Sequence, residues 1–356
     1  MDNRFKLVSE VGEEIIQEDE LKELLKKKKT FIAYDGFEPS GNMHVAQGIL
    51  RAINVNKMTK AGAKFKMLVA DWHGWANNKM DGDLKKIQKV GKYYIEMWKA
   101  CGMDLKNVEF IWANDLVNNP EYWKVVMEIA RNSTVKRIIR CGQIMGRTEG
   151  EVMQASQILY PCMQTADIFY LKADVCQLGM DQRKVNVLAR EVGPKLGFEK
   201  PVVVSHHMLM GLGQPSADVK DAVERAIDMK MSKSKPDSAI FMTDSFDEIK
   251  RKMGKAYCPA KEVNENPVLE YAKYLVFEKF DSLKIERPAK FGGDKVYKSY
   301  ASLEKDFVSG DLHPMDLKSA VAKSIDAMVA PVRKHFETNA AAKKLKAEVE
   351  SFKVTR

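Results

Sequence analysis

Cysteine is scarce in this sequence, and its few residues are not arranged for metal binding or for disulfide formation. The 356 residues include five cysteines, an odd number, and none belongs to a CxxC pair or stands beside a histidine at metal-ligand spacing. They are Cys101, Cys141, Cys162, Cys176 and Cys258. The pattern therefore predicts no zinc site, no other protein-bound metal and no disulfide framework.

Long apolar runs are also missing. No window contains 18 consecutive apolar residues, and the first ten residues, MDNRFKLVSE, have no apolar core. These absences argue against a secreted protein and against a membrane protein, and they favour the reducing cytoplasm. The GxGxxG and GxxxxGKS/T elements are absent as well, which removes support for dinucleotide binding and for P-loop hydrolysis.

Charge of both signs is plentiful, with a moderate excess of positive charge. Lysine and arginine number 58 against 49 aspartate and glutamate residues, which gives a net charge of +9. This excess favours anionic partners such as nucleic acid or nucleotides. With 45% hydrophobic residues the composition is that of a globular protein, and the length predicts roughly two domains of about 150 residues each.

The first third of the chain alternates between helical and strand patterns. We expect a helix over residues 12–29, a strand over 30–34, a helix over about 44–61, a strand over 64–71, a helix over 84–101 and a strand over 108–112. Asp35-Gly36 and Pro39-Ser40-Gly41 supply turn signals between the first strand and the helix that follows it. Strands that alternate with helices in this way are typical of a parallel α/β sheet.

Helical spacing replaces the strand signals after Pro120. It indicates a helical insertion over about residues 118–156, after which we expect residues 168–171 to resume the sheet and residues 201–204 to form another strand. The polar residues 211–225 and 229–237 predict a loop, and the apolar pattern beyond Asp244 is helical. The predicted fold is an α/β domain over residues 1–244 followed by an all-helical domain over residues 245–356.

Two separated motifs carry the chemistry that the sequence predicts. Residues 38–41 (EPSG) form a turn that leads into residues 44–47 (HVAQ) at the start of a helix, and residues 230–234 (KMSKS) lie in the polar loop. A helix N-terminus offers unpaired amide groups and partial positive charge, so His44 and its neighbours suit a triphosphate. Two lysines and two hydroxyls on a loop suit the charge of a leaving pyrophosphate.

The pair HVAQ and KMSKS resembles the two nucleotide-binding signatures of class I aminoacyl-tRNA synthetases. The surrounding sequence is similar to the tyrosine-specific family of archaeal and eukaryotic type, in residues 33–41 (AYDGFEPSG), 160–167 (YPCMQTAD), 179–184 (GMDQRK), 291–293 (FGG) and 313–316 (HPMD). Two positions depart from the wider class, since Gln47 replaces the second histidine of HIGH and Lys235 follows KMSKS. The resemblance implies a Rossmann-like catalytic domain and an enzyme that joins tyrosine to tRNA.

The same resemblance implies roles for individual residues. Tyr34 and Asp167 would bind the phenol of tyrosine, and the ammonium group would be held by Tyr160, Gln164 and Gln182. ATP, with Mg²⁺ as its counter-ion, would be held by Gly41, His44, Gln47, Met231, Ser232 and Ser234, and Lys230 and Lys233 would stabilise the pyrophosphate. The anticodon would be read by Phe291, His313 and Asp316. The implied partners are tyrosine, ATP, tRNA(Tyr) and a second copy of the chain bound through residues 118–156, with neither membrane nor DNA.

Simpler interpretations stand beside these roles. His44 could cap its helix locally, Tyr160 could be a packing residue, Phe291 could belong to a core, and Asp181 fits a loop cap as well as a site. Asp167 is different, because a carboxylate among apolar residues costs several kcal/mol unless it has a hydrogen-bonding partner, and a ligand hydroxyl is one such partner. For the whole chain the alternatives are a tryptophanyl-type or other nucleotidyltransferase of the same fold, and a catalytically inactive RNA-binding paralogue.

Overall fold

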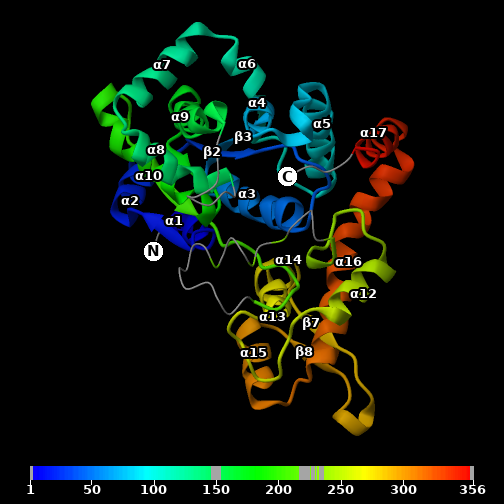
Figure 1. The fold of residues 1–356 in the computed structure, drawn as a ribbon. Coiled ribbons are helices and arrows are strands. Elements are labelled where there is room, and N and C mark those ends of the chain that lie inside the picture. The colour runs from blue at the N-terminus through cyan, green and yellow to red at the C-terminus, as the bar shows by residue number, and fades with distance from the viewer. Residues whose placement is uncertain are drawn as a thin grey trace.

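The computed structural model describes residues 3–145, 154–215, 225, 229, 231 and 236–352. The described residues form two parts, which Figure 1 shows one above the other: the elements up to β6 make the upper part, and α12–α16 with a small hairpin make the lower part. Helix α17, at the end of the chain, returns to the upper part and packs beside α5. None of the described helices combines the length and the apolar character that crossing a membrane requires.

A six-stranded sheet forms the centre of the upper part. Its strands are β1 (Glu14–Ile16), β2 (Phe31–Phe37), β3 (Ala63–Val69), β4 (Val108–Trp112), β5 (Val175–Cys176) and β6 (Val202–Ser205). They lie in the order β1-β6-β5-β2-β3-β4, and all neighbouring pairs are parallel except β1 with β6. The predicted parallel α/β sheet is therefore confirmed, with one antiparallel strand added at its edge.

Helices cover both faces of this sheet. They are α1 (Asn3–Ser9), α2 (Glu18–Lys27), α3 (Arg51–Lys60), α4 (Asp71–Ala76), α5 (Leu84–Ala100), α6 (Ala113–Val117), α7 (Pro120–Arg131), α8 (Val135–Cys141), α9 (Ala155–Tyr170) and α10 (Arg183–Val192). Phe65 on β3 packs into a core with residues of α3 and α5, whereas its sheet neighbour Tyr34 packs on the other face with residues of α7, α9 and α10. Alternate residues of a strand point to opposite faces, so one strand can contribute side chains to the cores on both faces of the sheet.

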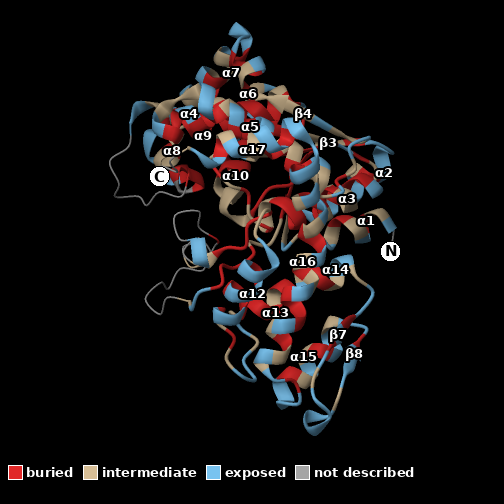
Figure 2. Cartoon of the chain, turned by 90° about the vertical axis from the view of Figure 1, so that its right-hand side faces the viewer, coloured by how far each residue is buried: buried red, intermediate tan, exposed pale blue. Residues whose placement is uncertain are grey.

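The lower part contains α12 (Phe246–Lys255), α13 (Pro267–Tyr271), α14 (Phe277–Lys279), α15 (Tyr300–Ser309) and α16 (Pro314–Thr338), and the chain ends with α17 (Ala340–Glu350). The expected helical character is present, but the part is not all-helical, because β7 (Leu283–Ile285) and β8 (Lys295–Tyr297) pair as an antiparallel hairpin. Three-residue strands are too short to show a clear alternation in sequence. Figure 2 shows that buried residues fill the interior of both parts.

Two expected elements are wrong. Residues 12–29 were expected to be one helix, yet residues 14–16 form β1 and pair with Ser205, Val204 and Val203 of β6 before α2 begins. Residues 168–171 were expected to be a strand, yet residues 168–170 end helix α9. Every residue from Tyr160 to Phe169 is buried, so this part of the helix lacks the exposed face that gives a 3.6-residue period in sequence.

Candidate active site

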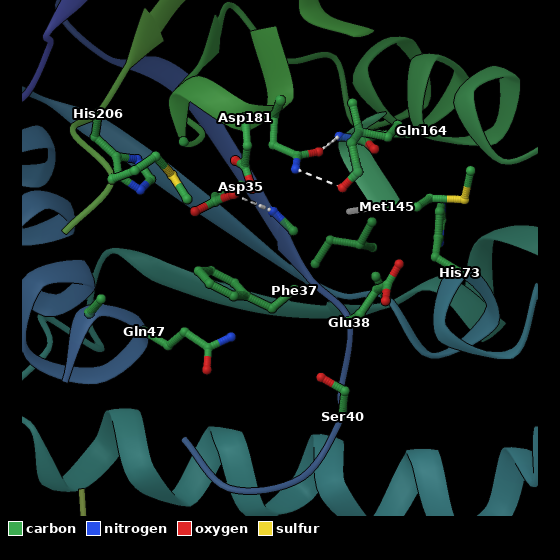
Figure 3. Close-up of a pocket in the computed structure, with 18 of the residues that line it drawn as sticks. Asp35, Phe37, Glu38, Ser40, Gln47, His73, Met145, Gln164, Asp181 and His206 are labelled. Atoms are coloured by element: carbon green, nitrogen blue, oxygen red, sulfur yellow. Dashed lines mark hydrogen bonds between the residues drawn. The ribbon is translucent and has the colours of Figure 1, made fainter. Parts of the chain in front are cut away.

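A cavity of about 410 Å³ opens beyond the carboxyl ends of β2 and β5. The strand order changes direction between these two strands, since β2 leads on to β3 on one side and borders β5 on the other. Open α/β sheets place their ligands at such a switch point. Figure 3 shows side chains from the end of β2, from the loop after it, and from α4, α9 and the segment around Asp181 that point into this cavity.

Most of the residues predicted for tyrosine and ATP line this one cavity: Tyr34, His44, Gln47, Tyr160, Gln164, Asp167, Gln182 and Met231. Gly41 lies in the loop between β2 and the HVAQ residues, with a φ of 102°, a left-handed conformation that favours glycine. The predicted residues Lys230, Ser232, Lys233 and Ser234 lie outside the described residues. Phe291, His313 and Asp316 lie in the lower part, away from the cavity lining.

Asp167 lies at the buried end of the cavity, on helix α9. Its side chain is fully buried, and its Oδ1 accepts a hydrogen bond of 2.8 Å from the hydroxyl of Tyr122 on α7. The Nε2 of His73 on α4 lies 2.9 Å from its Oδ2. These two contacts offset the cost of burying the carboxylate.

The environment of Asp167 raises the pKa of three groups around it. Burial and then the charge of Asp167 raise the pKa of Tyr34 well above its usual value, and they do the same for Tyr122. Burial by itself would lower the pKa of His73, but the attraction and hydrogen bond to Asp167 outweigh it and leave the pKa raised. This end of the cavity therefore holds one carboxylate among groups whose protonated forms are favoured, an arrangement suited to a ligand hydroxyl.

His73 and Tyr122 are site residues that the sequence reasoning missed. His73 stands in the stretch Trp72-His-Gly-Trp75, where neither spacing nor a motif marks it. Tyr122 belongs to a helix whose apolar face is ordinary. Their relationship to Asp167 exists only in three dimensions, because α4, α7 and α9 converge on it from separate parts of the sequence.

Polar acceptors occupy a second region of the cavity. The Nε2 of Gln164 donates to the Oε1 of Gln182 at 3.0 Å, and the Nε2 of Gln182 donates to the carbonyl of Ile144 at 3.2 Å. Figure 3 shows both hydrogen bonds. The Oε1 of Gln164 is buried and has no hydrogen-bond partner among the described residues. Burial and the nearby Glu38 raise the pKa of Tyr160 well above its usual value. This region therefore contains the phenol of Tyr160, the carboxylate of Glu38 and the free amide oxygen of Gln164, a set of groups that suits an ammonium ligand.

The opposite end of the cavity contains the HVAQ turn. Gln47 belongs to the π-helical turn η1 (Ala46–Leu50), and its Oε1 is buried without a hydrogen-bond partner among the described residues. The amide of Val45 donates to the carbonyl of Ile240 at 2.9 Å, and the amide of Met242 donates to the carbonyl of Met43 at 2.9 Å. The turn before α3 is therefore joined to residues 240–242, and Met231 lines the same cavity.

A buried ion pair supports the cavity wall from behind. The Nη1 of Arg51 lies 3.1 Å from the Oδ2 of Asp35 and 3.0 Å from the Nδ1 of His206. Burial raises the pKa of Asp35 to about 7, although Arg51 opposes the shift. Burial and the charge of Arg51 hold the pKa of His206 well below its usual value. His206 is therefore neutral, and its Nδ1 accepts from Arg51 while its Nε2 carries the proton.

The residues predicted for the anticodon lie near one another at the surface of the lower part. Phe291 is 61% exposed, and the Nζ of Lys290 lies 5.0 Å from the centre of its ring. His313 caps the first turn of α16, where its Nδ1 accepts from the amide of Met315, and Asp316 belongs to the same turn. Arg287 joins the two segments, since its Nε donates to the carbonyl of Gly293 and its Nη1 to the carbonyl of Asp311, both at 2.7 Å.

Comparison with known proteins agrees with this geometry. The sequence profile of the family "tRNA synthetases class I (W and Y)" matches residues 26–330. The cytoplasmic tyrosine–tRNA ligase 1 of Arabidopsis thaliana is 52% identical, over all of this chain and 90% of the relative. This chain belongs to the class I tyrosyl-tRNA synthetases. Membership confirms the predicted fold class and enzyme class, and the degree of identity favours the tyrosine branch over the tryptophan branch of the family.

Two solved structures of the family have the same fold. Tyrosyl-tRNA synthetase of Pyrococcus horikoshii, complexed with L-tyrosine, aligns with a TM-score of 0.90 and 39% identity over 98% of this chain and 100% of that one. Tyrosyl-tRNA synthetase of Leishmania major, in complex with tyrosinol, aligns with a TM-score of 0.90 and 44% identity. That alignment covers 99% of this chain and 53% of the Leishmania chain, so this chain spans about half the length of that relative.

Proposed function

We propose that the cavity binds tyrosine and ATP together, forms tyrosyl-adenylate, and transfers the tyrosyl group to the terminal ribose of tRNA(Tyr). The observation that carries the proposal is the composition of the two ends of one cavity. A buried carboxylate, Asp167, lies beside Tyr34 at one end, and the HVAQ turn with His44 and Gln47 lies at the other. A ligand that spans the cavity would present a phenol to the first end and a nucleotide to the second.

Tyrosine fits between these ends in one orientation. Its hydroxyl would donate to Asp167 and accept from Tyr34, whose raised pKa keeps the proton on the phenol. Its ammonium group would donate to Gln164 and approach Tyr160 and Gln182, where an amide acceptor has no other partner among the described residues. The carboxylate of tyrosine would then point toward the HVAQ turn.

The reaction needs no general base, because the carboxylate of tyrosine is already ionised at neutral pH. One of its oxygens attacks the α-phosphorus of ATP, the bond from the α-phosphorus to the bridging oxygen breaks, and pyrophosphate leaves with the electron pair. Catalysis then comes from positioning and from stabilising charge. His44 and Gln47 would contact ATP, and the roles of Lys230 and Lys233 at the pyrophosphate rest on the sequence resemblance alone.

Mg²⁺ would enter this site as part of the substrate. Among the described residues no three histidine, cysteine, aspartate or glutamate side chains are grouped so that they could hold a metal ion. The donor set therefore does not fit an all-protein metal site, whereas Mg²⁺ commonly binds through phosphate oxygens and water. We accordingly treat the ion as the counter-charge of ATP and assign no protein ligand to it.

The lower part would bind the anticodon. An exposed aromatic ring such as Phe291 offers a flat face on which an unstacked base can lie, and the neighbouring Lys290 is placed for a phosphate. The carboxylate of Asp316 can accept hydrogen bonds from the edge of a guanine, with His313 beside it. Arg287 would keep the two segments at the spacing that a short run of bases requires.

The division of the chain and its assembly are part of the same proposal. Residues 1–244 would form the catalytic domain and residues 245–356 the anticodon-binding domain, with a homodimer formed through residues 118–156. Support for the dimer comes from apolar side chains that the insertion exposes, since Met127 is 57% and Val135 66% exposed. We place the enzyme in the cytoplasm, the location printed in the name of the Arabidopsis relative.

One assay tests the central claim. Exchange of labelled pyrophosphate into ATP should depend on tyrosine, with phenylalanine and tryptophan giving far lower kcat/KM. Exchange with tryptophan in preference to tyrosine would assign the cavity to another branch of the family. An absence of exchange with every amino acid would indicate a catalytically inactive RNA-binding protein.

A further inference from the structure

The ATP-binding end of the cavity is in contact with the lower part of the molecule. We infer that helices α12, α13 and α16 position this end for ATP, with Lys252, Tyr271 and Arg333 as positioning residues. The inference rests on the proposed function, since it takes the HVAQ turn to be the nucleotide site. It differs from an arrangement in which the lower part only binds the tRNA and has no effect on the ATP-binding end.

The first contact holds residues 239–244, which border the HVAQ turn. Lys252 on α12 is only 4% exposed, and its Nζ donates to the carbonyl of Ala239 at 3.0 Å and to the Oδ2 of Asp244 at 2.7 Å. The same Oδ2 accepts from the amide of Phe241 at 2.9 Å, and the ammonium group lies 4.7 Å from the centre of the Phe241 ring. A buried charge thus fixes the path of this short segment.

Helix α16 also holds this segment, through the backbone of Asp244. The Nη1 of Arg333 donates to the carbonyl of Asp244 at 2.9 Å, and its Nη2 lies 2.6 Å from the Oδ1 of Asp326, two turns earlier in the helix. Because Asp326 orients the guanidinium, the donor reaches Asp244 in a defined direction. The first turn of this helix carries Asp316, so one continuous helix runs from the proposed anticodon surface to the nucleotide end.

Residues 240–242 connect the segment held by Lys252 and Arg333 to the HVAQ turn. They pair with residues 43–45 through the two backbone hydrogen bonds between Val45 and Ile240 and between Met242 and Met43. His44 is directly opposite Phe241 in this pairing. A displacement of Asp244 would therefore displace the backbone that presents His44 to the cavity.

The second contact holds Met210, which follows the cavity-lining residues 206–209. The hydroxyl of Tyr271 on α13 is fully buried and donates to the carbonyl of Met210 at 3.0 Å. The amide of Met210 donates to the Oε2 of Glu270 at 3.1 Å. The preceding residues Met208 and Leu209 line the cavity, so both polar groups of the Met210 backbone are fixed by α13 beside the cavity wall.

Conservative substitutions can test these contacts with little loss of side-chain volume. Tyr271→Phe deletes one buried hydroxyl, and Arg333→Met deletes the guanidinium while keeping most of the aliphatic chain. Tyr297→Phe is a matched control, because the hydroxyl of Tyr297 donates to Asp306 within the lower part and contacts neither segment. Arg333→Lys restores one donor and serves as the rescue variant.

The measurements are KM for ATP, KM for tyrosine and kcat in pyrophosphate exchange, with the melting temperature of each variant. We expect Tyr271→Phe and Arg333→Met each to raise KM for ATP about threefold to tenfold, as the loss of one hydrogen bond would. KM for tyrosine should stay within about twofold, Arg333→Lys should recover part of the loss, and Tyr297→Phe should match the wild type.

Two results would overturn the inference. One is an unchanged KM for ATP in both variants, and the other is a parallel rise of both KM values together with a lower melting temperature, which a purely structural role would produce. A wild-type enzyme without tyrosine-dependent exchange would instead refute the proposed function. The two failures are therefore distinguishable.

Discussion

The Nε2 of His73 lies 2.9 Å from the Oδ2 of Asp167, and both side chains are buried in the interior of the upper part. On the other oxygen of the carboxylate, the hydroxyl of Tyr122 donates at 2.8 Å. Three helices, α4, α7 and α9, thus converge to hold one carboxylate at the closed end of the cavity. A charge in this position is tolerated because it is paired, and it remains available to a ligand that brings a hydroxyl.

We predict that His73→Phe lowers kcat/KM for tyrosine roughly tenfold to hundredfold, because it leaves one oxygen of Asp167 without its charged partner while keeping a ring of similar size. The expected pH dependence has a definite sign. The pKa of His73 is raised, so its protonated form is favoured and is lost as the pH rises through that raised value. Activity of the wild type should therefore fall on the alkaline side, and the variant should lack that part of the fall.

The matched control for this substitution is His335→Phe. His335 also pairs with a carboxylate, Glu96, with its Nε2 3.0 Å from the Oε2, but it lies outside the cavity lining. Pyrophosphate exchange should be nearly unaffected by this control. If His73→Phe retained wild-type kcat/KM across the pH range, the imidazole would have no part in reading the phenol.

Tyr34 and Asp167 should together distinguish tyrosine from phenylalanine. Phenylalanine would bury both groups without a partner, and each unsatisfied group costs roughly 1–3 kcal/mol. In the double variant Tyr34→Leu with Asp167→Gly, we expect kcat/KM for tyrosine to fall and the preference over phenylalanine to shrink. Both substrates should be measured in pyrophosphate exchange, and a preference within about tenfold of the wild-type value would show that other residues read the hydroxyl.

Elements with one exposed face were predictable from the sequence, and elements that depend on distant neighbours were not. Strand β4 has the predicted bounds, Val108–Trp112, and α5 differs by one residue at its end. A polar residue, Asn107 or Asp83, precedes each of these elements. Asp83 caps the start of α5 by accepting from the amide of Lys86. In contrast, β1 depends on its pairing with β6, about 190 residues away in the sequence, and three residues carry no periodic signal.

The candidate site likewise contains residues that were predictable from the sequence and residues that were not. Motif residues such as His44 and Gln164 were found because their sequence context is specific, and the structure places them on one cavity. His73, Tyr122 and Arg51 have no such context, and their importance follows from contacts with Asp167 or Asp35 that only the folded chain creates. Asp35 was assigned to a turn, whereas β2 continues to Phe37 because it stays paired with β3 along its whole length.

Substitutions at the proposed anticodon surface should separate the two half-reactions. We predict that Phe291→Ala and Asp316→Ala leave pyrophosphate exchange within about twofold of wild type and lower kcat/KM for tRNA charging about tenfold to hundredfold, as the loss of one stacked or hydrogen-bonded base would. Val308→Ala removes another exposed apolar side chain from the same part and should affect neither reaction. Equal losses in exchange and charging would contradict the assignment of this surface.

His207 should give stability that depends on pH. Its Nδ1 lies 3.2 Å from Glu13 and its Nε2 3.1 Å from Glu270, and its ring stacks on Tyr274. Burial opposes its protonation, but the two carboxylates outweigh burial and raise its pKa to about 9. The stabilisation is therefore fully present below the unfolded pKa of about 6.5 and is lost as the pH rises through 9, with an upper limit of about 3 kcal/mol.

The test is the free energy of unfolding of the wild type and of His207→Gln at intervals from pH 6 to pH 10. The difference between the two proteins isolates the imidazole from other groups that titrate in this range. We expect the wild type to be more stable at pH 6 and the difference to shrink toward pH 10. A difference that stays constant over the whole range would mean that His207 is not the titrating group.

Gly48 lies against Met242 where the HVAQ turn meets the segment after the KMSKS sequence. A Cβ atom at position 48 would overlap the Sδ of Met242 and lie 2.9 Å from its Cγ, well inside van der Waals contact. Met242 is fully buried, so its side chain cannot move aside into solvent. The close approach of these two segments therefore requires glycine at this position.

We predict that Gly48→Ala destabilises the fold by about 1–3 kcal/mol through overpacking and raises KM for ATP, because the turn that carries His44 and Gln47 must shift. Met242→Ala alone should also destabilise the fold by leaving a cavity. In the double variant the added methyl group occupies part of the vacated space. The double variant should therefore be destabilised by less than the sum of the two single destabilisations, with a difference of about 1 kcal/mol or more.

Gly254→Ala is the control. A Cβ at this helical position meets open space, so the substitution should leave stability unchanged or raise it slightly. Chemical denaturation of all four variants measures these energies, and strict additivity of Gly48→Ala and Met242→Ala would show that the two residues do not limit each other's space.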